Sequence, residues 1–161
     1  MNKQLQDHVE EHSKVIEEMV TEIVSKYADD LDKYIYNIER VLNNPDEEID
    51  DNDLNRIMIR LSTYAYFVGG KSELAAIRKD VSEMVRDEKY NNFFMNISGT
   101  VANKTAEATS QIHEEAVIAT IYDRAYKILK IKYDSTVRLI DTVKKIISMR
   151  IQQMQLGTRN I

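Results

Sequence analysis

The few residues whose spacing suits catalysis begin with two histidines near the amino terminus. His8, Glu11 and His12 fit the H-x-x-E-H pattern of inverted zinc peptidases, in which two histidines one helical turn apart bind zinc and the glutamate activates water. Here the pattern lies at the start of an amphipathic helix, and no neighbouring segment would enclose a pocket. We therefore interpret these side chains as surface residues and predict no metal site.

Carboxylates form two further clusters with the chemistry of divalent-cation ligands. Glu17 and Glu22 precede Glu47 and Asp50, a set that resembles the carboxylates of all-α nucleotide pyrophosphohydrolases. Magnesium chemistry needs such groups to converge from facing helices, whereas the second pair falls in an acidic segment, 43–53. That segment also lacks the central glycine and the closing glutamate of a calcium loop, so we interpret it as a solvated loop.

The sequence shows neither an activated nucleophile nor a phosphate-binding loop. There is no cysteine, which excludes thiolate ligands and thiol nucleophiles. The pair Gly69-Gly70 lacks the G-x-x-x-x-G-K-[ST] frame of a P-loop, and His113 lies in the middle of a helix without a serine placed for a triad. We predict no catalytic residue, no cofactor and no small-molecule substrate, so the chain is not expected to be an enzyme.

Binding chemistry is better represented, in the segment from Lys71 to Gly99. Cations that can pair with phosphates precede aromatic rings that can stack on bases, which is the combination used for single-stranded nucleic acid. The candidate contacts are Lys71, Arg78, Lys79, Arg86, Lys89, Tyr90, Phe93 and Phe94. Interleaved acids weaken the basic character of this segment, and its aromatics could pack in a core instead, so both interpretations stay open.

The net charge of −5 hides an uneven distribution along the chain. Residues 1–53 hold 16 acids against 5 bases, and residues 124–161 hold 2 acids against 9 bases. The basic end forms a row that could attract nucleic acid locally. It could equally be a solvated face, or the surface on which the acidic first helix docks.

Long helices are the expected secondary structure, because the chain has only one proline and four glycines and both residues disfavour helix interiors. Apolar residues recur at steps of three and four. This spacing predicts helices over about 3–43, 53–68, 73–94 and 104–156. A break within the first helix near Ala28–Asp30, where an aspartate could cap a new helix, is left open.

The predicted fold is therefore all-α, with long amphipathic helices around a central αα-hairpin. Its segments are an acidic helix at 1–44, a hairpin at 45–103 that turns at Gly69-Gly70, and a basic helix at 104–161, together forming one domain with helical extensions. Two helices of about 40–50 residues are too long for the hairpin to cover, and uncovered apolar stripes mark interfaces. We expect a homo-oligomer, with contacts through Tyr122, Tyr126, Leu129, Tyr133, Ile140 and Ile147.

The order of elements after residue 55 resembles a known family. A basic helix running into KYNNFFMNISG, followed by a long helix containing AYKILKIKYDSTVRLIDTVKKIISMR, is similar to the UvsY-type recombination mediator proteins of tailed phages. The resemblance covers about residues 55–155. This sequence differs in carrying Asp87 and Glu88 where the family is more basic, and in its longer acidic first helix.

The resemblance implies a homo-oligomer that binds single-stranded DNA, contacts a single-strand binding protein and a recombinase, and helps the recombinase to load. It implies DNA contacts at Arg86, Lys89, Tyr90, Phe93, Phe94, Ser98 and Gly99. The alternative is a structural or regulatory helical adaptor, such as a virion component, that touches only protein. No apolar run reaches the ~18 residues of a membrane helix and the first residues are unlike a signal peptide, so we expect a cytoplasmic protein, in the host if phage-encoded, without a membrane partner.

Overall fold

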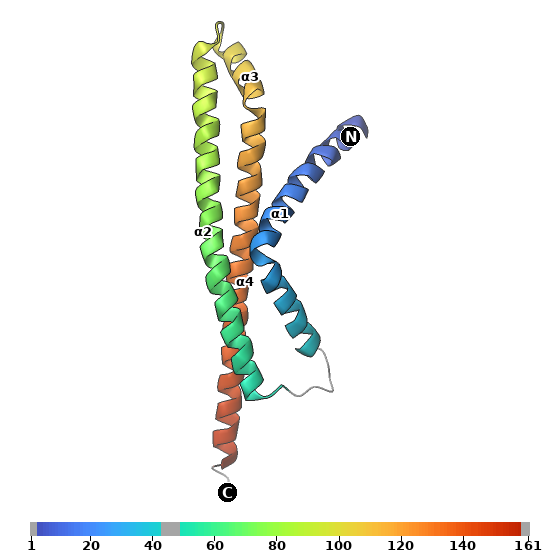
Figure 1. The fold of residues 1–161 in the computed structure, drawn as a ribbon, viewed down its shortest axis with the longest axis vertical. Helices are drawn as coiled ribbons and strands as arrows, with labels where there is room; N and C mark the ends of the chain where they lie inside the picture. The colour runs from blue at the N-terminus through green and yellow to red at the C-terminus, as the bar shows by residue number, and fades with distance from the viewer. Residues whose placement is uncertain (1–2, 43–48, 159–161) are drawn as a thin grey trace. The chain divides into compact units, whose positions relative to one another are not determined.

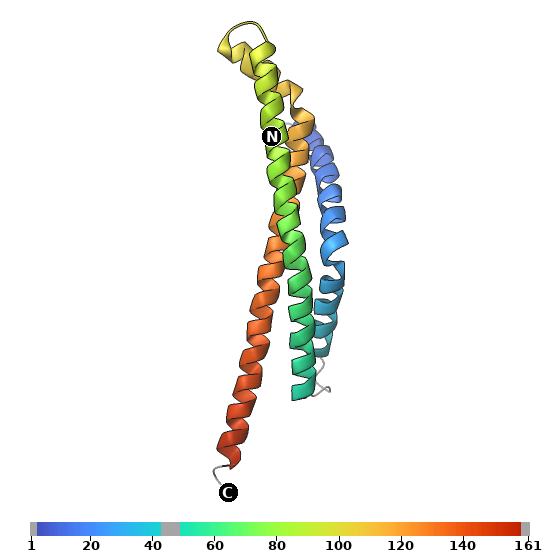
Figure 2. The same cartoon turned by 60° about the vertical axis from the view of Figure 1, so that its left-hand side comes forward.

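The computed structural model describes residues 3–42 and 49–158, of which 3–9, 11–12, 42 and 157–158 are described by their backbone alone. Four helices account for nearly all of these residues: α1 (Lys3–Leu42), α2 (Asp51–Asn96), α3 (Val101–Gln111) and α4 (His113–Thr158). Figures 1 and 2 show their course. The described ranges contain no strand, and the helices pack together, so the prediction of an all-α helical bundle is confirmed.

The helices are shared between two compact units. Unit 1 combines Met1–Lys26 with Lys71–Ile128, and unit 2 combines Tyr27–Gly70 with Leu129–Ile161. Each unit therefore takes pieces from α1, α2 and α4. Among the described residues, no helix has the combination of length and apolar character that crossing a membrane requires.

Unit 2 is a bundle of the second half of α1, the first half of α2 and the second half of α4. Its core follows the helical spacing of the sequence, and its buried residues are Ala28, Leu31, Ile38, Leu54, Leu61, Ala65, Val68, Leu129, Thr136, Ile140 and Val143. The rings of Tyr34 and Tyr64 lie 5.4 Å apart between α1 and α2. Within the predicted helix 53–68, the apolar residues Leu54, Leu61 and Val68 lie on the buried face.

Charges at opposite ends of the sequence meet in unit 2. Lys132 of α4 lies 2.6 Å from the carboxylate of Asp32 in α1. Arg150 of α4 donates to the carbonyl oxygen of Ile49 at 2.7 Å and to the carboxylate of Asp51 at 3.1 Å. Two residues of the basic row, Lys132 and Arg150, thus bind residues of the acidic segment 1–53. These contacts fix the register of α4 against α1 and α2.

The first helix is continuous through the position where a break was considered. Ala28 and Leu31 are each 1% exposed, so the helix buries this stretch on its inner side. Asp29 lies 2.5 Å from the ammonium of Lys33, one turn further along. This pair stabilises the helix at positions i and i+4, and Asp29 does not cap a new helix.

The prediction of a turn at Gly69-Gly70 is wrong, because α2 runs through both glycines. Two interior glycines cost a helix roughly 1 kcal/mol each relative to alanine, but burial of Val68 and Ala75 on either side of them offsets this cost. Gly69 also makes room for a neighbour, since a Cβ there would lie 3.0 Å from the ring of Tyr133. The central αα-hairpin is therefore a single helix.

These two glycines make a matched pair of stability variants. Gly70→Ala is expected to raise the free energy of unfolding by about 0.5–1 kcal/mol, because a Cβ there meets nothing within 4 Å. Gly69→Ala gains the same helix propensity but crowds the ring of Tyr133, so it should fall short of Gly70→Ala. Thermal unfolding followed by circular dichroism measures both. Equal effects of the two variants would contradict the close packing of Tyr133 on α2.

The hairpin of this protein lies in unit 1, where α2 turns into α3. The turn is centred on Gly99, whose φ of 129° lies in the region that favours glycine, and it falls in the gap between the predicted helices 73–94 and 104–156. Thr100 caps α3 by accepting a hydrogen bond from the backbone of Asn103 at 3.4 Å.

A second difference from the predicted elements is the division of the last helix into α3 and α4. Ile112 leaves the helical conformation, with φ −103° and ψ 17°, while its side chain stays buried. No proline or glycine marks this position in the sequence. Because the side chain remains in the core, the interruption changes the backbone without breaking the apolar row.

Candidate nucleic-acid interface

The aromatic residues predicted to stack on bases gather where α2 ends and α3 begins. The rings of Tyr90 and Phe94 are stacked, with centroids 6.0 Å apart and planes at 23°. The ammonium of Lys104 lies 5.7 Å from the centroid of Phe94, within the range of a cation–π contact. These residues and Phe93 are half-buried, so each ring keeps part of its surface in solvent at the end of the hairpin.

Three of the predicted cations are held by carboxylates of their own chain. Arg86 lies 2.8 Å from Asp87, and Lys79 lies 3.2 Å from Glu83 and 3.4 Å from Asp80. The third pair joins two helices, because Lys89 of α2 donates to Glu115 of α4. Ion pairs near the protein surface contribute little to stability, so a phosphate could replace the carboxylate.

The pKa values of this region follow from the same ion pairs. The hydrogen bond from Lys89, followed by one from the backbone of Glu115 itself, lowers the pKa of the Glu115 carboxyl from its ordinary value. The hydrogen bond to Glu83 raises the pKa of Lys79. Both shifts favour the charged forms, so Glu115 keeps its negative charge to lower pH, and Lys79 its positive charge to higher pH, than the same groups without their partners.

The predicted cations do not form one continuous row. Lys71 and Arg78 are exposed and lie seven residues apart, on the same side of α2. Lys79 and Arg86 lie on the adjacent, half-buried side. The structure therefore brings Arg86, Lys89 and the aromatic residues together towards the hairpin end, and leaves Lys71 and Arg78 with a different face.

Of the residues predicted to contact another copy, two belong to the core of the chain itself. Leu129 is 0% exposed and Ile140 is 7% exposed, which leaves them almost no surface for a second copy. The remaining four are half-buried, namely Tyr122, Tyr126, Tyr133 and Ile147. For those four the interface stays a prediction.

Two residues near the hairpin end were not among the predicted contacts. Lys104 stands as far after Gly99 as Phe94 stands before it, so a turn centred on Gly99 would have indicated their approach. Glu115 has no such signal, because its distance from Lys89 depends on how α3 and α4 are joined.

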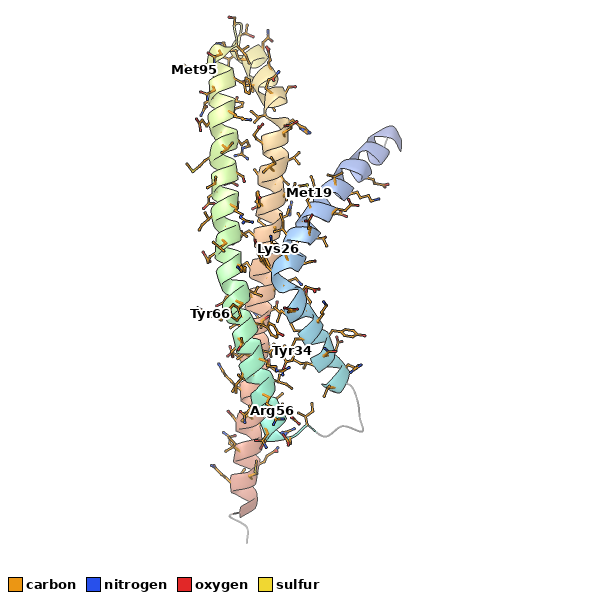
Figure 3. All side chains as sticks on the ribbon, viewed as in Figure 1. Met19, Lys26, Tyr34, Arg56, Tyr66 and Met95 are labelled. Atoms are coloured by element: carbon orange, nitrogen blue, oxygen red, sulfur yellow. The ribbon has the colours of Figure 1, made fainter. Side chains whose placement is uncertain are left out.

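An exposed aromatic pair in unit 2 was also missed: Tyr66 and Phe67 lie edge to face at 5.5 Å, and Figure 3 labels Tyr66 on the outside of α2.

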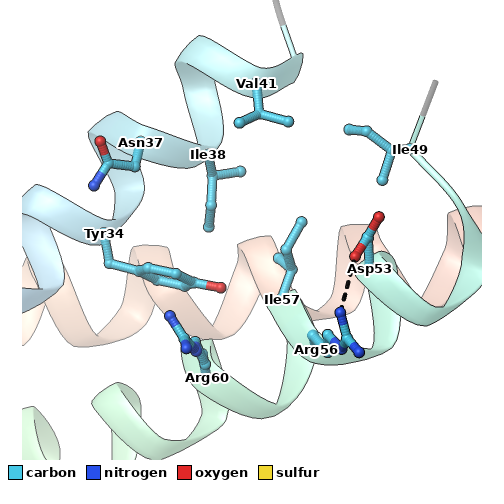
Figure 4. Close-up of a pocket in the computed structure, with 9 residues that line it drawn as sticks. All are labelled: Tyr34, Asn37, Ile38, Val41, Ile49, Asp53, Arg56, Ile57 and Arg60. Atoms are coloured by element: carbon cyan, nitrogen blue, oxygen red, sulfur yellow. Dashed lines mark ion pairs between the residues drawn. The ribbon is translucent and has the colours of Figure 1, made fainter. Parts of the chain in front are cut away.

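Unit 2 also contains a groove of about 560 Å³ between the end of α1 and the start of α2. Figure 4 shows its lining, with the Arg60 guanidinium 5.7 Å from the ring centroid of Tyr34 and Arg56 paired with Asp53 at 3.5 Å. Burial raises the pKa of the Tyr34 hydroxyl. Residues 43–48, which join the two sides, lie outside the described part, so the groove carries no functional assignment.

Metal ligands do not converge in the described part of the chain. No three or more His, Asp or Glu side chains are grouped there so that they could hold a metal ion. The side chains of His8, Glu11 and His12, and those of Glu47 and its neighbours, lie outside the described residues. What the described residues do offer is a cluster of cations and half-exposed rings at the end of the hairpin.

Comparison with known proteins adds no further constraint on function. No family model, no curated protein and no solved structure matches this chain. Function is therefore inferred from the side chains and their geometry.

Proposed function

We propose that this protein is a non-enzymatic single-stranded DNA-binding protein of the recombination-mediator type, which works as a homo-oligomer in the cytoplasm, that of the host if it is phage-encoded. It would hold DNA while a recombinase replaces a single-strand binding protein. The observation that carries the proposal is the hairpin end, where Lys104 lies over the ring of Phe94 and Phe94 stacks on Tyr90. On the same helix, Arg86 lies one turn before Tyr90, and Lys89 immediately precedes Tyr90.

The side chains would act by neutralising phosphates and stacking on bases. Arg86 and Lys89 are bound to carboxylates in the free protein, and a phosphate can take the place of each carboxylate. The exposed parts of Tyr90, Phe93 and Phe94 would stack on bases, which contributes about 1–3 kcal/mol per base and does not depend on sequence. The protein would therefore bind single strands of any sequence and prefer them to duplex.

Binding of a fluorescent oligothymidylate to the whole chain tests the proposal, with fluorescence anisotropy as the readout. We expect saturable binding at about 50 mM salt, where phosphate contacts are strong, and weaker binding to a duplex of the same length. An absence of binding at this salt concentration would rule out the DNA-binding function.

A second candidate function is that of a structural or regulatory helical adaptor that contacts only protein. The ion pairs of Lys79, Arg86 and Lys89 favour it, because each carboxylate competes with phosphate. So does the amount of exposed apolar surface on the helices. This candidate predicts oligomers that do not change when single-stranded DNA is added.

Replacing Glu115 by glutamine is expected to raise the affinity for single-stranded DNA severalfold. The substitution removes the carboxylate that Lys89 contacts and leaves the ammonium available for a phosphate. Glu114→Gln is the matched control, because Glu114 is the exposed neighbour and its loss changes the net charge equally. If both variants bind DNA with the same affinity, Lys89 is not a phosphate contact.

A further inference from the structure

The most unusual surface of unit 1 is an apolar face on the outside of α2. Five large apolar side chains at helical spacing are between 42% and 69% exposed: Leu74, Ile77, Val81, Met84 and Val85. Figure 3 shows Met95, two heptads beyond Val81, on the side of α2 that faces away from α3.

The opposite side of the same stretch is the one that the chain covers, although its residues are small or polar. Ser72 and Ala75 are buried there, and Lys79, Ser82 and Arg86 are half-buried. A helix normally turns its apolar stripe towards the core. Among the residues that the structure describes, none covers this apolar stripe, and a contiguous exposed apolar patch marks an interface.

The spacing of this face is that of a coiled-coil seam. Leu74 and Val81 are seven residues apart, and so are Ile77 and Met84. Alternating steps of three and four place these four residues at positions a and d of two heptads. A seam of this kind fits another helix with the same repeat.

The charges beside the seam indicate which partner helix fits it. One edge carries Glu73, Asp80 and Asp87, which take the g positions. The other edge carries Lys71 and Arg78, which take e positions. In a parallel pair the g residues of one helix face the e residues of the other, whereas in an antiparallel pair g faces g and e faces e. The two edges of this face therefore match a second copy of the same face, and only when the helices run in parallel.

We propose that α2 pairs in parallel and in register with α2 of a second copy of this chain, through Leu74, Ile77, Val81 and Met84. Glu73 of one copy then faces Arg78 of the other across one edge, and the same pair forms on the other edge by symmetry. Because the seam uses the side of α2 opposite to Lys79 and Arg86, pairing leaves the hairpin end accessible. The pairing does not depend on DNA: an absence of DNA binding would leave the pairing standing, and failure of the pairing in the cysteine test would leave DNA binding standing.

Single cysteines test the pairing and its direction in the full chain, which has no native cysteine. Leu74→Cys and Met84→Cys, each oxidised separately, should both give disulfide-linked homodimers, because equivalent residues face each other in a parallel pair. Ser110→Cys, exposed on α3, is the control and should give none. Residues 74 and 84 are about 15 Å apart along a helix, so a mixture of the two variants should give few mixed dimers. Mixed dimers as the main product would establish an antiparallel pair and overturn the proposal.

Sedimentation velocity provides the second test. The wild-type chain should sediment as an oligomer at micromolar concentration, and a variant with Ile77→Gln and Val81→Gln should sediment as a monomer. Both residues are exposed in the chain itself, so helicity by circular dichroism should stay unchanged in the variant. A wild-type monomer, or a variant that assembles like the wild type, would overturn the proposal.

Discussion

Replacing Leu61 by alanine is expected to lower the free energy of unfolding by about 2–5 kcal/mol. Leu61 is 0% exposed and lies in the middle of the buried face of α2 in unit 2. Truncation removes apolar contacts and leaves a cavity that neighbouring helices fill only in part. Guanidinium denaturation followed by circular dichroism measures the change in the free energy of unfolding. The unfolding transition of unit 2 should have its midpoint at a lower guanidinium concentration in the variant.

Ile59→Ala is the control for this variant, since Ile59 lies two residues earlier on the same helix and is 63% exposed. It should change the free energy of unfolding by less than about 1 kcal/mol, the range of most surface substitutions. If Ile59→Ala destabilises the protein as much as Leu61→Ala, the assignment of the buried face of α2 is wrong.

Replacing Arg86 and Lys89 together by glutamine is expected to weaken single-stranded DNA binding about tenfold or more and to make it less sensitive to salt. Each phosphate contact on a single strand contributes about 0.7 to the slope of log affinity against log salt concentration. Loss of two contacts should therefore reduce the slope by about 1.4. Anisotropy titrations at several salt concentrations measure the slope directly.

The matched control removes two charges elsewhere, with Lys144→Gln and Lys145→Gln on α4 in unit 2. Both side chains are exposed, and the change in net charge is the same. A general effect of charge would weaken DNA binding equally in the two variants. If the control lowers the slope and the variant at Arg86 and Lys89 does not, the DNA site lies on the basic row of α4 instead of the hairpin end.

The helices and one of their buried faces could be predicted from the sequence, because a 3.6-residue period is a local property. The residues Leu54, Leu61 and Val68, spaced seven apart in the predicted helix 53–68, are buried on one face. The turn at Gly69-Gly70 was wrong for a tertiary reason, since the packing of Tyr133 against Gly69 stabilises a helix that propensity disfavours. The interruption at Ile112 has no sequence signal, because neither glycine nor proline occurs there.

The stripe from Leu74 to Val85 shows a limit of periodicity. Its spacing identifies an apolar face on the helix but does not say whether that face is covered by the same chain. The small residues on the other side, Ser72 and Ala75, turned out to be the buried ones. Only the arrangement of helices in space distinguishes the two faces.

The residue types of the candidate site could be predicted from the sequence, but its ion pairs could not. The aromatic residues at the end of the basic helix were visible as Tyr90, Phe93 and Phe94. The ion pair between Lys89 and Glu115 was not, since it joins residues of two helices whose register depends on the turn and on the interruption at Ile112. This pairing decides how easily a phosphate gains access to Lys89.

The most direct test of the account is sedimentation velocity of the chain with a fluorescent single strand, detected at the wavelength of the label. The protein is proposed to bind DNA as an assembly of parallel copies, without catalysis. We predict that the labelled strand sediments with a species that contains more than one copy of the chain. A strand that sediments alone, beside protein that remains monomeric at micromolar concentration, would contradict the account.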